Sequence, residues 1–441
     1  MRALRLAFRF VHIAWVFVIA ALVYAGRRVA AGRLDRAGVE SLRGEVLAKA
    51  FEKLGATFIK LGQIMSTRPD LLGPGYTGKL ARLQDAVPPA PFESVRAVLA
   101  AELSPASRAR LAFIEPTPIA AASVAQVHRA RLDTGEDVAL KVQRAEAEPQ
   151  IERDLAILEL LGRAIDRLPS MRLLSLPGSI ERFGEALRGQ LDFRQEAANN
   201  RRFAKNFEGS PGVDVPGLFP ELCTRRVLGM ELITGAKATD TDGAVGDRKK
   251  LARIGGEAIL QMVFVDGFVH ADLHPGNILL TPDERVVLID LGMVTEIPEN
   301  LRRPWVETFV ALSQRDGAQV ARLFYEHAPA VGKLAYAEFE RDVAEQLAKI
   351  LGKNLGDMEV GQAVSGMMNV LRRHRVQVDP SFTVVHIALL VAEGLGKQLD
   401  PHIDLVALAV PYLMQAMISA PPGRPPLRTP PRTLPSADAA A

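Results

Sequence analysis

The sequence predicts an α+β fold in which helices at both ends of the chain enclose a short group of strands. Apolar residues recur at steps of three and four over residues 38–68 and again over 301–419, which is typical of helices that bury one face. Between residues 113 and 143 the period changes to two, which indicates strands. With 441 residues, the chain has room for two or three domains.

The composition argues against several classes of function. Lys and Arg number 54 and Asp and Glu number 51, so the net charge is +3 (54 − 51), and no basic block suggests binding to nucleic acid. Cys223 is the sole cysteine, which excludes an intramolecular disulfide and a cysteine-based metal site. A chain of this kind fits a reducing, cytoplasmic compartment.

Residues 1–34 are a candidate membrane anchor. They contain no acidic residue, and the uncharged run Phe10–Gly26 has 17 residues, the lower limit for a helix that spans a bilayer. Arginines flank the run on both sides, at Arg2, Arg5, Arg9, Arg27, Arg28 and Arg33. Three arrangements fit this pattern: a spanning or deeply inserted anchor, an amphipathic helix on the membrane surface, and a helix packed on the following domain.

A helical extension is predicted over residues 35–112. Its helix over 38–68 carries an apolar stripe made of Leu47, Phe51, Leu54, Phe58, Leu61 and Met65. Lys60 and Gln63 lie off this stripe and are neighbours on the helix, because they are three residues apart. Gly62 costs about 1 kcal/mol relative to alanine inside a helix, and it permits close approach by another segment.

A first lobe with a sheet is predicted over residues 113–235. Three strands are expected, at Pro118–Ala122, Val124–Leu132 and Asp137–Gln143. Ala139 and Lys141 share one face of the third strand. A lysine there can reach phosphates while the small neighbour leaves room for a base, and an exposed lysine on an edge strand is the alternative.

The turn between the first two strands contains no glycine. Its residues, expected to line a nucleotide, are Ala120, Ala121, Ala122, Ser123 and Val124. Alanine disfavours positive φ, so this turn should be stiffer than a glycine-rich loop over phosphates. Ser123 can still contact phosphate through its hydroxyl or its backbone N–H.

Helical material is inserted after the third strand, at about residues 145–180. A further helix over Glu181–Phe203 carries Glu196, which lies 55 residues after Lys141. We expect Glu196 to pair with Lys141, because a phosphate-binding lysine on a strand needs an acidic partner on a packed helix.

The end of the first lobe is predicted to contact the base of a nucleotide. Residues 225–235 form a strand and a linker, and the backbone groups around Glu231 and Ile233 would meet the adenine edge.

The strongest chemical signal lies in the second lobe, predicted over residues 236–420. An Asp at 272, an Asn at 277 and an Asp at 290, directly after the apolar strand Arg285–Ile289, form the layout of a kinase-type phosphotransfer centre. Asp272 would orient or deprotonate the nucleophile. Asn277 and Asp290 would hold Mg²⁺ with hard oxygen ligands.

Zinc is a competing interpretation of the same stretch. His270 and His274 are four residues apart with Asp272 between them, a spacing that can place two ligands on one helix face. Pro275 and Gly276 argue for a loop, and no third soft ligand is near.

The stretch after Gly292 contains no Ala-Pro-Glu motif and no long loop that could hold a peptide. Pro421–Pro435 contains seven prolines in fifteen residues, so residues 421–441 are predicted to be a disordered tail.

Five motifs together resemble the UbiB family of atypical kinases, also called ADCK-type. They are Lys60–Gln63, the alanine-rich Ala120–His128, Val138–Lys141, Leu191–Ala197 and His270–Asn277. The resemblance covers roughly residues 42–418 and keeps the motif order. The Lys-x-Gly-Gln helix and the alanine-rich loop are the motifs specific to that family.

The resemblance implies an atypical protein-kinase-like, two-lobed fold with Lys-x-Gly-Gln helices packed over the active site. It implies ATP and Mg²⁺ as cofactors, membrane association and support of ubiquinone biosynthesis. The partners implied are membrane lipid or a quinone precursor, and ubiquinone biosynthesis proteins. Lys60, Gly62, Gln63 and Asp192 would be regulatory, and proteins would not be phosphorylated in trans. The family's Glu-x-Asp motif begins with Gln190 here, which removes one possible charge partner of Lys60.

Two alternatives from other classes remain. A small-molecule phosphotransferase of the aminoglycoside or choline kinase type has similar catalytic loops but lacks the Lys-x-Gly-Gln helix. A non-enzymatic, nucleotide-gated lipid-binding scaffold is the second, although all the phosphotransfer residues are present in this chain.

Overall fold

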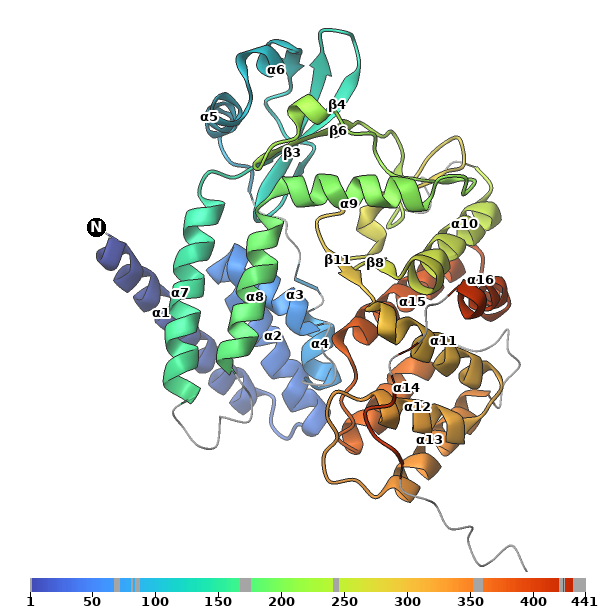
Figure 1. Cartoon of the computed structure of the whole chain (residues 1–441). Helices are drawn as coiled ribbons and strands as arrows, with labels where there is room; N and C mark the ends of the chain where they lie inside the picture. Colours follow the sequence, from blue (N-terminus) through green and yellow to red (C-terminus); the bar gives the residue numbers. More distant parts are fainter. Residues whose placement is uncertain are drawn as a thin grey trace, which may run out of the picture. The chain divides into compact units, whose positions relative to one another are not determined.

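The computed structural model describes residues 2–66, 72–80, 82–83, 88–166, 176–240, 246–351, 360–419, 423 and 425–430 (Figure 1). The chain divides into two compact units. Unit 1 consists of Met1–Arg201 and Pro216–Ile233, and unit 2 of Arg202–Val215 and Thr234–Ala441. The boundary after Ile233 lies two residues before the predicted end of the first lobe. The transfer of Arg202–Val215 to unit 2 is not apparent from the sequence.

Unit 1 begins with four helices, α1 (Arg2–Ala30), α2 (Arg36–Leu54), α3 (Ala56–Ser66) and α4 (Pro74–Leu80). The single helix predicted over 38–68 is wrong, because the chain breaks at Gly55, whose φ of 89° is a conformation that glycine adopts readily. The predicted apolar stripe is confirmed: Phe51, Leu54 and Phe58 are buried, and its other three residues pack against them.

The sheet of unit 1 is antiparallel, with the order β1-β3-β4-β6 and with β2 also paired to β3. Its strands are β1 (Leu111–Ile114), β2 (Ala120–Ala121), β3 (Ala125–Leu132), β4 (Asp137–Gln143) and β6 (Val227–Glu231). The three predicted strands are therefore confirmed. The first two are shorter than predicted, and residues 122–124 form the turn between them. Short helices α5 (Phe92–Glu102) and α6 (Pro105–Ala109) precede the sheet.

Alternation along β4 assigns the two faces of this sheet. Val138, Leu140 and Val142 pack with Val95 and other residues of α5 in one cluster. The opposite face packs against α7 (Ala147–Asp166), α8 (Leu176–Gln190) and the start of α9 (Phe193–Asn206). The single helix predicted over Glu181–Phe203 is wrong, since Leu191 and Asp192 separate α8 from α9.

Unit 2 contains two small sheets. One has the order β5-β10-β9-β7, in which β5 and β10 are parallel, and the other pairs β11 with β8. The strands are β5 (Val213–Asp214), β7 (Ala236–Lys237), β8 (Phe268–His270), β9 (Ile278–Leu280), β10 (Val286–Leu288) and β11 (Val294–Glu296). These short strands hold the loops that carry Asp272, Asn277 and Asp290.

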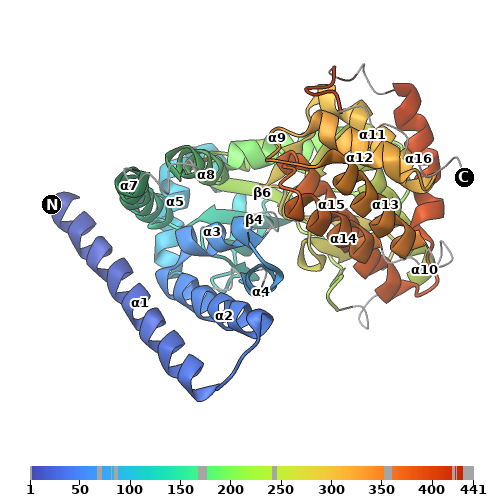
Figure 2. The ribbon, with the colours of Figure 1, turned by 90° about the horizontal axis from the view of Figure 1, so that it is seen from below.

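Helices make up the rest of unit 2, in agreement with the predicted helical C-terminal region (Figure 2). They are α10 (Arg248–Leu260), which continues as a π-helical turn over Gln261–Asp266, α11 (Glu299–Ser313), α12 (Gly317–His327), α13 (Tyr336–Leu351), α14 (Val360–Arg373), α15 (Pro380–Leu399) and α16 (Leu405–Ser419). Helices α10, α15 and α16 share a core with β8, β9 and β10, and α12, α13 and α14 share a second core.

Part of the proline-rich tail is bound to α12. The Leu427 N–H donates to the carbonyl of Glu326 at 2.9 Å, and the Arg428 guanidinium donates to the carbonyls of Ala328 and Pro329. The prediction of a disordered tail therefore does not describe these residues, because the carbonyls at the end of α12 give the tail hydrogen-bond partners.

Candidate phosphotransfer site

Lys141 lies in the middle of β4, opposite Val127 of β3 and Leu228 of β6. Its Nζ donates to both carboxylate oxygens of Glu196, at 2.8 and 2.9 Å. The two side chains are only 12% and 7% exposed. The structure thus brings together the lysine and the glutamate that the sequence analysis pairs, in a contact shielded from water.

The first turn of α9 positions Glu196. Phe193 is buried, donates its N–H to the carbonyl of Arg225 at 2.9 Å, and places its ring 5.4 Å from the Lys141 Nζ. Asp192 precedes the helix and accepts the Arg194 N–H at 3.1 Å. These contacts fix the start of α9 against β4, and the aromatic ring adds a favourable interaction with the lysine charge.

The alanine-rich turn is closed and anchored. Its Ala122 N–H donates to the carbonyl of Ala125 at 2.8 Å, and Ser123 and Val124 are buried. The Arg144 guanidinium donates to the carbonyl of Ala122 at 2.9 Å. The backbone N–H of Arg144 donates to the carbonyl of Val124, also at 2.9 Å. Arg144 therefore holds both ends of the turn, a role that no sequence motif signals.

A polar cavity of about 530 Å³ lies beside this turn. Its lining includes Ser123, Arg144, Glu146 and, from the α2–α3 junction, Glu52 and Gly55. Ligand pockets commonly have volumes of about 300–1,000 Å³. Unit 1 thus has open space next to the residues expected to contact phosphate.

A buried polar network joins β3 to the segment before α5. The His128 Nδ1–H donates to the carbonyl of Glu115 at 2.7 Å, so its Nε2 accepts from the Gln126 amide at 2.8 Å. Gln126 in turn accepts the Ala90 N–H at 2.8 Å. Burial lowers the pKa of His128, which favours the neutral imidazole that this bonding requires.

The residues of the Lys-x-Gly-Gln motif lie on α3. The Gln63 side chain donates to the carbonyl of Leu83 at 3.2 Å. A Cβ added at Gly62 would lie 2.8 Å from Phe51 Cδ2 and still nearer to the Leu83 side chain, so the predicted close approach at this glycine is confirmed. Lys60 is buried.

Asp192, predicted as a regulatory residue, is bound by a neighbour. The Arg194 guanidinium contacts its carboxylate at 2.6 Å, and this hydrogen bond lowers the pKa of Asp192. The charge partner of Asp192 in this structure is therefore Arg194.

The end of β6 holds the residues predicted to meet adenine. The Glu231 N–H donates to the carbonyl of Gly217 at 2.7 Å, so this donor is already used within unit 1. Ile233 is the last residue of unit 1. Ala139, expected beside the base, is buried on β4 opposite Met230.

In unit 2 the catalytic-loop residues are tied together by backbone contacts. The Asn277 Nδ2 donates to the carbonyl of Asp272 at 3.0 Å, and the Asn277 carbonyl accepts the Ile289 N–H at 2.9 Å. Asp290 follows with a φ of 56°, a left-handed conformation that Asp tolerates better than most residues. The backbone hydrogen bond from Ile289 to Asn277 connects the segment that carries Asp290 to the catalytic loop. An amide oxygen and a carboxylate are hard donors of the kind that suits Mg²⁺.

The two histidines of this loop support its backbone. The buried His270 accepts the Asp272 N–H on Nδ1 at 3.2 Å and donates from Nε2 to the carbonyl of Ile289 at 3.3 Å. Burial lowers the pKa of His270, which favours the neutral imidazole that this bonding requires. The His274 Nδ1 accepts the Gly276 N–H at 3.1 Å. The described residues contain no cluster of three or more His, Cys, Asp or Glu arranged to hold a metal.

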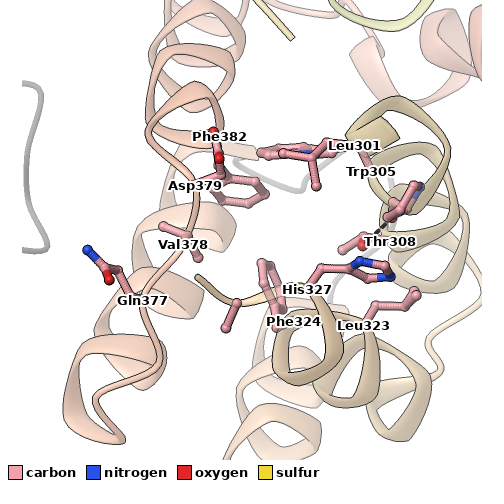
Figure 3. Close-up of a pocket in the computed structure, with 12 residues that line it drawn as sticks. Leu301, Trp305, Thr308, Leu323, Phe324, His327, Gln377, Val378, Asp379 and Phe382 are labelled. Atoms are coloured by element: carbon pink, nitrogen blue, oxygen red, sulfur yellow. Dashed lines mark hydrogen bonds between the residues drawn. The ribbon is translucent and has the colours of Figure 1, made fainter. Parts of the chain in front are cut away.

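A second cavity, in unit 2, lies between α11, α12 and the start of α15 (Figure 3). The rings of Trp305, Phe324 and Phe382 and the side chains of His327 and Asp379 border it. Its volume is about 40 Å³, far below that of a ligand pocket. The Asp379 carboxylate caps α15 by accepting the Ser381 N–H at 3.0 Å. We regard this cavity as a gap in an aromatic core.

Two protein-family models match the chain. Residues 82–324 match the ABC1 atypical kinase-like domain, and residues 343–404 match the UbiB helical domain. The chain is 37% identical over 380 residues to the probable protein kinase UbiB of Aeromonas hydrophila, covering 84% of this chain and 70% of that protein. It is 36% identical over 392 residues to the protein of that name from Pseudomonas aeruginosa, covering 87% and 74%.

A solved structure shares the fold. The complex of Rv3197 with erythromycin from Mycobacterium tuberculosis superposes with a TM-score of 0.59 and covers 83% of this chain and 94% of that one. The two sequences are 23% identical, so this likeness concerns the fold alone.

Proposed function

Because the chain belongs to the UbiB family of ABC1-type atypical kinases, we propose that it binds ATP with Mg²⁺ and uses it at a membrane in support of ubiquinone biosynthesis. The observation that carries the proposal is the shielded pair of Lys141 and Glu196, with Nζ–O distances of 2.8 and 2.9 Å. In kinases such a pair presents the lysine ammonium to the nucleotide phosphates.

Each candidate residue has a defined task in this proposal. Lys141 binds phosphate oxygens, and Glu196 keeps its ammonium in place. The closed turn Ala120–Val124 covers the phosphates, while Asp272 orients the attacking group. Asn277 and Asp290 would hold Mg²⁺, which supplies positive charge against the phosphate oxygens when bound.

The chain after Asp290 supports an acceptor other than a protein. Strand β11 starts at Val294 and α11 starts at Glu299, so no long loop is available to hold a peptide. The acceptor would then be water, or a membrane lipid or quinone precursor.

Asp290→Asn tests the nucleotide site. This variant replaces the main anionic Mg²⁺ ligand with a neutral amide while keeping a side chain that tolerates positive φ, so the fold should persist. We expect the Mg²⁺-dependent thermal shift with ATP to disappear. Asp283→Asn, at an exposed carboxylate in the same unit, is the matched control and should keep the shift.

A cellular experiment tests the biological role. A strain that lacks this protein should lose ubiquinone and accumulate a precursor, and the parent gene should restore the profile. The Asp283→Asn gene should restore it and the Asp290→Asn gene should not. A normal quinone profile in the deletion strain would contradict the proposed role.

A further inference from the structure

Helix α1 has an exposed outer face and an inner face that contacts the rest of unit 1. Its outer stripe consists of Leu4, Phe8, Val11, Trp15, Val18 and Leu22, whose side chains are 51–68% exposed. Its inner stripe consists of Leu6, Arg9, Ile13, Val16, Ala20 and Tyr24. At 3.6 residues per turn the two stripes lie on opposite sides of the helix. A helix of 29 residues, about 43 Å long, thus presents a continuous row of large apolar side chains to its surroundings.

The inner stripe attaches the first half of α1 to unit 1. Ile13 and Val16 are buried in one core with residues of α2, α3 and α7. The Arg9 guanidinium donates to both carboxylate oxygens of Asp154 at 2.6 and 2.8 Å and to the carbonyl of Leu54 at 2.6 Å. Asp154 is fully buried and also accepts the Thr57 hydroxyl at 2.8 Å.

The second half of α1 is attached as well. Arg43 of α2 donates to the Tyr24 hydroxyl at 3.2 Å and stacks over the Tyr24 ring. Arg27 pairs with Glu45 of α2 at 2.8 Å. Contacts near both ends therefore hold α1 antiparallel to α2, and the ribbon shows the two helices joined by a short connection (Figure 2).

This attachment is incompatible with α1 crossing a bilayer. By length and composition, Leu4–Ala30 could span a membrane. Its neighbour α2, however, carries charged residues along its length: Arg36, Glu40, Arg43, Glu45, Lys49, Glu52 and Lys53. Crossing would require either taking these charges into the hydrocarbon or detaching α1. Detachment would leave Asp154 buried without its arginine, which is unfavourable.

The charge of the segment indicates what covers the outer stripe. Residues 1–34 contain six arginines and no acidic residue. Arg9 and Arg27 pair with Asp154 and Glu45, so the positive charge of the segment comes from the other four arginines. A positively charged helix with a row of large apolar side chains is suited to binding anionic lipids. Such a helix lies parallel to the membrane plane, at the boundary between headgroups and acyl chains.

We infer that α1 lies flat on an anionic bilayer, with the outer stripe embedded and the inner stripe still bound to α2, α3 and α7. This inference rests on the proposed function at a membrane and specifies the surface that makes the contact. The pair of Arg9 and Asp154 keeps unit 1 docked on the helix that enters the lipid.

Vesicle binding tests the outer stripe. The full chain should sediment with vesicles of phosphatidylcholine and phosphatidylglycerol and much less with phosphatidylcholine alone. Phe8→Gln combined with Trp15→Gln should weaken binding by at least about tenfold, since two large apolar groups no longer enter the lipid. The matched control is Phe113→Gln with Ile119→Gln, two exposed apolar residues at the sheet, and it should bind as the parent does.

The depth of Trp15 tests the orientation. The chain has two tryptophans, so a Trp305→Phe background isolates its fluorescence. Lipids brominated near the headgroup should quench Trp15 strongly, and lipids brominated near the bilayer centre should quench it weakly. A tryptophan placed by Leu22→Trp in a background with both Trp15→Phe and Trp305→Phe should give the same depth. A central depth for Trp15 would show a spanning helix and overturn the inference.

Light scattering and nucleotide binding complete the test. If the Phe8 and Trp15 variant binds vesicles normally but changes its oligomeric state in light scattering, the outer stripe is a protein interface and the inference is wrong. Nucleotide binding, measured by thermal shift without vesicles, should be equal in parent and variant. If the parent protein does not bind nucleotide, the proposed use of ATP is contradicted. The vesicle-binding result for α1 is unaffected by that outcome.

Discussion

At the scale of single residues, the pair of Lys141 and Glu196 combines a structural and a chemical role. Both side chains are largely buried, so the contact between them is shielded from water and each charge stabilises the other. The Lys141 ammonium balances the negative charge of Glu196, which allows α9 to pack on β4. Binding of a nucleotide would add phosphate oxygens around the same ammonium.

Lys141→Ala should destabilise the protein by about 3–5 kcal/mol, because it removes the ammonium that lies 2.8 and 2.9 Å from the oxygens of the buried Glu196 carboxylate. The double variant Lys141→Met with Glu196→Leu should recover most of this stability, since both charges of the pair are removed together. Neither variant should hydrolyse ATP. Urea unfolding and an ATPase assay measure the two effects separately, and a double variant that regains turnover would remove Lys141 from the chemistry.

Asp266 provides a test of pH dependence. Burial raises its pKa to about 6, and one carboxylate oxygen has no hydrogen-bond partner among the residues that the structure describes. The folded state therefore disfavours the charged form. This destabilisation is absent below about pH 4, grows as the pH rises to about 6, and is constant above that.

Asp266→Asn should thus stabilise the protein above pH 6.5. The raised pKa corresponds to about 3 kcal/mol. We expect a gain of about 1–2 kcal/mol, because the carboxyl group is partly exposed and solvent screens its charge. The gain should vanish toward pH 4. Unfolding curves of parent and variant across this range measure it. A gain that does not change with pH would show that the charge of Asp266 is unimportant.

At the scale of elements, the contact between α3 and the residues after α4 depends on a missing side chain. Gly62 lies against Phe51 and Leu83, whereas Gly78 of α4 has open space where a Cβ would lie. The two glycines are both helical, so they form a matched pair.

Gly62→Ala should destabilise the protein by about 1–3 kcal/mol, because the added methyl group overlaps two packed side chains. Gly78→Ala should stabilise it by up to about 1 kcal/mol through helix propensity. Thermal unfolding compares the two. Equal effects would mean that α3 can move away from Leu83 without loss, and the tight packing of this helix would then be unimportant.

At the scale of the whole molecule, family membership and the short connection after Asp290 point to a kinase fold without a peptide-binding loop. The C-terminal helices α11–α16 occupy the chain that follows. The proposed acceptor is accordingly not a protein.

The purified chain, supplied with radiolabelled ATP and Mg²⁺, should transfer no phosphate to casein or myelin basic protein in trans, while it hydrolyses ATP slowly. Anionic vesicles should raise the hydrolysis rate without enabling protein phosphorylation. Robust labelling of either protein by the parent, absent in the Asp290→Asn variant, would contradict the proposed acceptor.

The sequence by itself determined the parts of this protein that depend on neighbouring residues. The period of two predicted the strands around Lys141, and the period of 3.6 predicted the buried stripe on α2 and α3. The apolar run Arg285–Ile289 predicted a strand before Asp290, and β10 lies there, whereas β9, directly after Asn277, was not predicted. Local patterns suffice here because backbone geometry sets which side chains share a face.

Only the tertiary structure decided the contacts between distant segments. Arg9 and Asp154 are 145 residues apart, and Arg144 reaches back 22 residues to Ala122, yet no sequence pattern indicates the partner of either arginine. The break at Gly55 is likewise hidden within an uninterrupted apolar period. The physical reason is that periodicity reports which face is apolar, whereas the partner of a charge or a bend depends on where the fold places the rest of the chain.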